Sequence, residues 1–115
     1  MLMVSPLFGH HSISAEFDRT KPIEFSGTVV SLDWMNPHVY VNIKAKNEAG
    51  KTVVYAVECG APNGLFYRGW RKDSLKPGDF VKVDGLRAKK PESNHIGIAT
   101  IRMSDGQAFG RGTAR

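Results

Sequence analysis

Three histidines are the side chains of this sequence best suited to hold a metal ion. His10 and His11 are adjacent near the start of the chain, and His38 directly follows Asn36-Pro37, which is a turn signal. Imidazole nitrogens combined with an amine give the nitrogen-rich, near-planar ligand set that suits Cu(II). The sequence therefore predicts a metal site made by His10, His11 and His38, with copper as the first ion to test and no other cofactor.

Two routes to copper need a free amine beside the histidines. In a chain that begins at His10, the α-amine and the imidazole of that residue chelate one ion, and His11 or His38 supplies a third nitrogen. In a chain that begins at Gly9, His11 is the third residue and binds Cu(II) together with the amine and two deprotonated backbone amides. A chain numbered from Met1 can use neither route.

A ligand pocket is also predicted around the turn before His38. Trp34, Met35, Tyr40 and Trp70 are its expected lining, and the Met35 thioether, the His38 imidazole and the Trp34 ring face offer a third route, to Cu(I). The alternative is structural, because no local ligand spacing such as CxxC or HxxxH is present. In that case His38 hydrogen-bonds the turn backbone and the His10-His11 segment is ordinary surface.

Catalytic chemistry finds little support in the residues. Cys59 is the single cysteine, so no internal disulfide is possible, and it ends an alternating strand pattern that predicts a buried and unreactive thiol. No GxSxG, HExxH or phosphate-binding glycine loop occurs. Five carboxylates are scattered along the chain, and nothing marks two of them as an acid/base pair: Glu16, Asp18, Glu24, Asp33 and Glu58. We expect a binding protein rather than an enzyme.

The charge balance favours anionic partners without choosing among them. Sixteen Lys and Arg stand against eleven Asp and Glu, for a net charge of +5, and the basic residues are spread along the chain. One alternative function is an anion or single-stranded nucleic-acid module. Its stacking platform would consist of Tyr40, Lys44, Tyr67, Arg68, Trp70 and Arg71. We expect no nucleic-acid partner, because export would separate the protein from nucleic acid. A protein adaptor in the cell envelope is a further alternative.

The elements that must position these residues are mostly strands. Alternating or Val-rich runs predict strands over 23–34, 38–46, 51–59, 80–88 and 95–104, with a short helix or turns within 60–75. In 38–46, Val39, Val41, Ile43 and Ala45 share one face. Gly27 is expected to mark a bulge or bend in the first strand. The order predicts an all-β protein with minor α content: a five-stranded OB-like Greek-key barrel with a short helix or loop between strands three and four. A small β-sandwich or an up-and-down barrel is the rival.

The chain has room for one domain. Residues 1–9 are uncharged and mostly apolar, too short to span a bilayer, and similar to the end of a secretory signal. We therefore expect a periplasmic protein with an apparently truncated signal or a disordered apolar tail over 1–9, a single barrel domain over 10–109, and a flexible basic tail over 110–115. No transmembrane segment is expected, and the oligomeric state is left open.

Several segments spread over positions 10 to 109 resemble one bacterial family. They are His10-His11-Ser12, Glu16-Phe17-Asp18, Lys21-Pro22, Gly27-Thr28-Val29, Trp34-Met35-Asn36-Pro37-His38, Pro62-Asn63, Arg68-Gly69-Trp70, Ser74-Leu75-Lys76-Pro77-Gly78-Asp79, Gly85 with Arg87-Ala88-Lys89, and Asp105-Gly106. The chain is similar to exported proteins of the family called domain of unknown function 6152. The resemblance implies export with a signal that ends just before His10 and a small OB-like β-barrel, and it carries over no catalytic residue.

Overall fold

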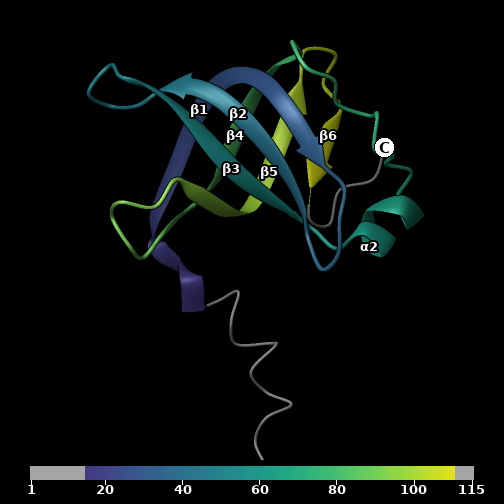
Figure 1. Ribbon diagram of the computed structural model, residues 1–115, viewed down its shortest axis with the longest axis horizontal. Coiled ribbons are helices and arrows are strands. Elements are labelled where there is room, and N and C mark those ends of the chain that lie inside the picture. The colour runs from purple at the N-terminus through teal and green to yellow at the C-terminus, as the bar shows by residue number, and fades with distance from the viewer. Residues whose placement is uncertain (1–14, 111–115) are drawn as a thin grey trace, which may run out of the picture.

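The computed structural model describes residues 15–110, which form one strongly curled β-sheet and one short helix (Figure 1). The strands are β1 (Phe17–Asp33), β2 (Val39–Lys46), β3 (Thr52–Gly60), β4 (Phe80–Ala88), β5 (His95–Met103) and β6 (Ala108–Gly110). The helix α2 (Pro62–Tyr67) lies between β3 and β4. The predicted all-β class with a short helix at this place is confirmed. The predicted count of five strands is wrong, because Ala108–Gly110 adds a sixth that pairs with β5.

The predicted flexible tail over 110–115 begins one residue too early, because Gly110 is the buried last residue of β6. The expectations for residues 1–9, for His10 and His11, and for 111–115 lie outside the described residues. No helix within 15–110 is both long enough and apolar enough to cross a membrane.

The hydrogen-bonded pairings of β1 to β5 form a closed ring. The sheet order is β3-β2-β1-β4-β5-β6, and β3 also pairs with β5 in parallel through Ala56↔His95 and Val57↔Ile96. Each of β1 to β5 therefore has at least two hydrogen-bonded neighbours. The long β1 serves two partners: its earlier part pairs with β4 and its later part with β2, and it arches over the sheet in Figure 1.

The centre of β1 runs very close to β2 at Gly27. A Cβ on Gly27 would lie 2.7 Å from Ile43 Cγ2 and would also meet the Lys44 carbonyl oxygen. The register of β1 against β2 shifts a little further on, between Val29 and Ser31. The expected irregularity in this strand is therefore present, and glycine at position 27 is explained by the close approach of two backbones.

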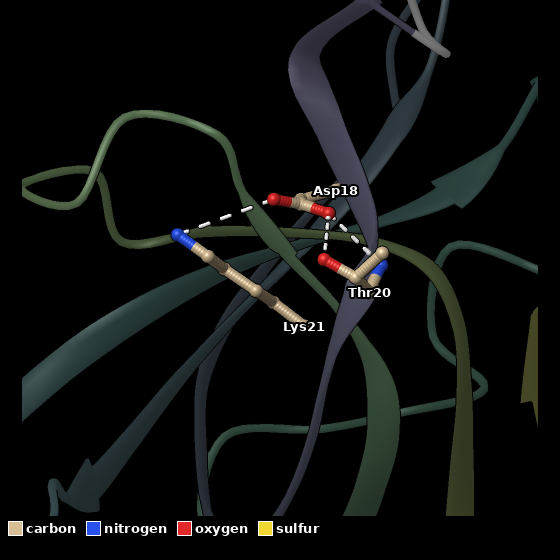
Figure 2. Close-up of polar contacts among 3 residues, drawn as sticks. All are labelled: Asp18, Thr20 and Lys21. Atoms are coloured by element: carbon tan, nitrogen blue, oxygen red, sulfur yellow. Dashed lines mark hydrogen bonds and ion pairs between the residues drawn. The ribbon is translucent and has the colours of Figure 1, made fainter.

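A second irregularity lies near the start of β1, where the register against β4 shifts between Phe17 and Pro22. Figure 2 shows the contacts that hold this stretch. Asp18 Oδ1 accepts hydrogen bonds from the Thr20 backbone N–H at 2.9 Å and from Thr20 Oγ1 at 2.6 Å. Lys21 Nζ lies 4.0 Å from Asp18 Oδ2. The Asp18 carboxylate thus accepts a hydrogen bond from a backbone N–H group at the place where the pairing of β1 with β4 is interrupted.

The core fills the inside of the curled sheet. In β2 the predicted alternation is confirmed: Val39, Val41 and Ile43 are fully buried and Ala45 is 7% exposed, while the residues between them face outward. Trp70, which follows α2, is also fully buried and packs edge-to-face on Phe109 of β6, with ring centroids 4.5 Å apart. This aromatic pair explains why the short sixth strand belongs to the fold, because it closes the core beside α2.

Candidate functional site

His38 stands at the end of the β1–β2 connection, beside a buried carboxylate. Its Nε2 lies 3.9 Å from Glu58 Oε2, with the His38 side chain 24% exposed and Glu58 only 1% exposed. Glu58 Oε2 also accepts a hydrogen bond from the Gly60 backbone N–H at 3.0 Å. The carboxylate is thereby fixed beside one edge of the His38 ring. In metal sites, a carboxylate beside a histidine ligand commonly orients its ring.

The polar contacts continue from His38 and Glu58 to β5. Tyr40 is the register partner of Glu58, and its ring centroid lies 6.0 Å from that of His95. His95 Nδ1 lies 2.7 Å from Glu16 Oε2, an exposed contact between the first described residues and β5. Since β3 and β5 pair at Ala56↔His95, these side chains share the outer face of β2, β3 and β5. We call His38, Tyr40, Glu58, His95 and Glu16 the outer polar strip.

The electrostatics of the strip act on Tyr40. Partial burial raises the pKa of Tyr40 above its usual value of 10.0, and the negative charges of Glu16 and Glu58 raise it further. Both carboxylates are therefore close enough to act on one phenol. The strip has a negative local character, which favours a bound cation over an anion.

Of the three predicted metal ligands, the structure places one. His38 is on the outer polar strip, whereas His10 and His11 lie outside the described residues. Within 15–110, no three His, Cys, Asp or Glu side chains come close enough together to hold a metal ion. A site at His38 therefore needs ligands beyond those that the described residues supply.

The four residues of the predicted ligand pocket are separated by the fold. Trp34 lines an open cleft of about 360 Å³ with Phe66, Arg71, Lys72 and Asp73. Met35 is 50% exposed and is not part of that lining.

Tyr40 lies on the outer polar strip, and Trp70 belongs to the core against Phe109. The prediction of one pocket lined by Trp34, Met35, Tyr40 and Trp70 is therefore wrong. Trp34 lines a cleft, and Tyr40 lies on a separate strip. The sequence suggested one pocket because it gave no distance between the β1–β2 connection and the segment after α2.

The stacking platform predicted for nucleic acid lacks one of its aromatic rings, because Trp70 is buried in the core. Trp70 is 0% exposed and cannot stack on a base, while Tyr67, on α2, is 88% exposed. Tyr40 and Lys44 do share the outward face of β2. They lie in the same face as Glu58 and near Glu16, whose charges oppose a phosphate backbone.

Glu58, Glu16 and His95 were not among the predicted site residues. A signal for Glu58 was present, since a glutamate next to Cys59 in an apolar strand is a candidate for a buried, paired charge. For Glu16 and His95 no local signal existed, because they are 79 positions apart and only the pairings of β1 with β4 and of β4 with β5 bring them together. Cys59 is buried as expected, and its Sγ lies 3.5 Å from the Val57 carbonyl oxygen.

Comparison with known proteins gives one result. A family model described as a family of unknown function (DUF6152) matches residues 2–98, which is most of the chain. No curated protein and no solved structure matches this chain. With the family model covering β1 through the first part of β5, the chain belongs to the DUF6152 family.

Proposed function

We propose that this chain is a small, exported, OB-like barrel that binds copper rather than catalysing a reaction, with His38 as the fixed ligand and His10 and His11 completing the site. The observation that carries the proposal is His38, half-buried, with Nε2 3.9 Å from the buried carboxylate of Glu58. We assign the metal ion to Nδ1, the nitrogen of the same ring that does not face Glu58. The support for an OB-like barrel is the ring of pairings among β1 to β5, with α2 between β3 and β4.

Chain length allows the N-terminal histidines to reach this face. Glu16 contacts His95, and His11 precedes Glu16 by five residues. A fully extended chain of five residues spans about 17 Å. Three steps lead from Glu16 to His38. They are the 2.7 Å contact of Glu16 with His95, the 6.0 Å between the ring centroids of His95 and Tyr40, and roughly 7 Å along the chain from Tyr40 to His38. The extended reach of this tether is therefore of the same order as the length of the strip that it has to cover.

The local charge supports a cation at this place. The carboxylates of Glu16 and Glu58 both raise the pKa of Tyr40, so their negative potential extends along the outer polar strip. A copper ion bound at His38 would be stabilised by the same potential. A binding role also agrees with the position of Cys59, whose full burial removes the one thiol that could serve as a nucleophile.

The test is a Cu(II) titration of protein that begins at His10, followed by calorimetry and by visible absorption of the bound ion. We expect one equivalent to bind, and we expect His38→Ala to weaken binding by about tenfold or more. The control is Phe80→Ser, at an exposed position on β4 outside the outer polar strip. It should leave the affinity within about twofold of the wild type.

Equal copper affinity for the wild type and for a His10→Ala, His38→Ala double variant would refute the proposal. Equal affinity for proteins that begin at Met1 and at His10 would exclude the free amine as a ligand and support a site made by the histidine side chains.

A further inference from the structure

A second surface, distinct from the outer polar strip, lies at the end of the sheet where the β1–β2 connection meets α2 (Figure 1). Three of its side chains are large, apolar or aromatic, and exposed: Met35 at 50%, Phe66 at 52% and Tyr67 at 88%. Trp34, which precedes Met35, lines one cleft together with Phe66. We call Trp34, Met35, Phe66 and Tyr67 the aromatic end. Exposed large side chains gathered from two segments commonly mark an interaction surface.

The aromatic end is held in place rather than loosely exposed. The Arg71 guanidinium carbon lies 3.7 Å from the Phe66 ring centroid, and Arg71 Nη1 donates to the Phe66 and Trp70 carbonyl oxygens at 3.1 and 2.9 Å. Phe66 is thus fixed in an exposed position by a cation that is itself fixed. A surface ordered before binding loses less conformational entropy when it binds.

The charges around the aromatic end are mainly positive. Residues 61–72 contain Arg68, Arg71 and Lys72 and no acidic residue. Arg71 and Lys72 are exposed and line the same cleft as Trp34 and Phe66. Asp73, the next residue, is the one acidic side chain in the lining of that cleft. The surface therefore combines aromatic rings, a thioether and basic groups, as interfacial membrane-binding surfaces do.

We propose that the aromatic end docks on the surface of an anionic phospholipid bilayer, with Phe66, Tyr67 and Met35 entering the headgroup region and Arg71 and Lys72 contacting lipid phosphates. A peptide seated in the cleft would cover Trp34 and Phe66 but would leave Tyr67, the most exposed of the three, in water. A planar interface contacts the exposed side chains of Phe66 and Tyr67 together. The basic flank matches the anionic headgroups in charge.

The experiment is sedimentation of the full chain with vesicles of phosphatidylcholine alone or of equal parts phosphatidylcholine and phosphatidylglycerol, in the presence of a chelator. We expect binding to the anionic vesicles that weakens as salt is added. A Phe66→Ser, Tyr67→Ser double variant should bind about tenfold more weakly. Lys72→Glu changes the charge by two and should bind about twentyfold more weakly, whereas Asp73→Asn changes it by one and should bind up to about fivefold more tightly.

Two matched controls lie on β4, away from the aromatic end. Phe80 is 61% exposed, so Phe80→Ser removes a comparable ring, and Lys82→Glu makes the same charge reversal as Lys72→Glu. Both should bind anionic vesicles within about twofold of the wild type. Tyr67→Ser alone provides a second test if the double variant fails to fold, since Tyr67 is 88% exposed.

The proposal is overturned if anionic vesicles bind no more protein than neutral ones, which would leave a protein partner as the occupant. It is also overturned if the Phe66, Tyr67 variants bind as the wild type does, or if Phe80→Ser weakens binding equally. Since copper is removed throughout, none of these outcomes depends on the metal site.

Discussion

Tyr40 is the residue whose titration reports on the outer polar strip. Its pKa is raised first by burial, then by the charge of Glu16 and then by that of Glu58. We expect Glu16→Gln to lower the pKa of Tyr40 more than Glu58→Gln does. The measurement is the phenolate absorbance of each protein minus that of its Tyr40→Phe partner. A larger effect of Glu58→Gln would contradict the arrangement described for the strip.

The same shift has a consequence for stability at alkaline pH. A phenol whose pKa is raised by folding contributes stability that is complete below its unfolded value of 10.0 and is lost as pH rises through the folded value. The free energy of unfolding should therefore fall with pH above about 10 more steeply in the wild type than in Tyr40→Phe.

Cys59 gives a second test at the residue scale. Its side chain is fully buried, with Sγ 3.5 Å from the Val57 carbonyl oxygen. We expect a thiol reagent to modify native protein only at the rate of unfolding and to modify denatured protein at once. Cys59→Ser should lower the free energy of unfolding by about 1–3 kcal/mol, since a hydroxyl is more costly to bury than a thiol. Fast modification of native protein would show that the strand end opens.

At the scale of the element, Gly27 tests the close approach of β1 and β2. Gly27→Ala would place a Cβ 2.7 Å from Ile43 Cγ2 and against the Lys44 backbone. We expect a loss of about 1–3 kcal/mol in the free energy of unfolding by urea. The control is Gly64→Ala in α2, where the new Cβ is in ordinary contact with the Arg68 guanidinium at 3.5 Å. That change should be neutral or stabilising, because alanine favours a helix.

Asp18 provides an acid-side test of the irregular start of β1. The hydrogen bonds from Thr20 lower the pKa of Asp18, with smaller contributions from the positive charges of Lys21 and Lys89. Its contribution to stability is therefore complete above the usual carboxyl value of 3.8 and is lost as pH falls through the lower folded value. In thermal unfolding, the melting temperature of Asp18→Asn should fall less steeply with decreasing pH than that of the wild type. Parallel curves would mean that the contacts in Figure 2 do not form in solution.

At the scale of the whole molecule, the contact of Phe109 with Trp70 joins the last strand to the segment after α2. Phe109 is fully buried, and the ring centroids are 4.5 Å apart. Phe109→Ala should lower the free energy of unfolding by about 3–5 kcal/mol. Phe80→Ala, at an exposed position, should change it by less than about 0.5 kcal/mol. A small loss for Phe109→Ala would show that β6 is dispensable for the core.

The sequence by itself determined the class of fold, most of the strands and the inward face of β2. These follow from side-chain alternation, which is local: a period of two in 38–46 places Val39, Val41 and Ile43 on one side whatever the strand packs against. The same local argument predicted the helix after β3, the irregularity in β1 and the burial of Cys59.

Only the tertiary structure decided which polar and aromatic residues lie together. The parallel β3–β5 pairing brings His95 and Glu16 to the face of Tyr40, and the packing of Trp70 on Phe109 takes that ring out of the predicted pocket. Such contacts depend on strand order and register between segments far apart in the chain, and no local period encodes them. That is why the sequence could single out His38 but could not supply Glu58 as its partner.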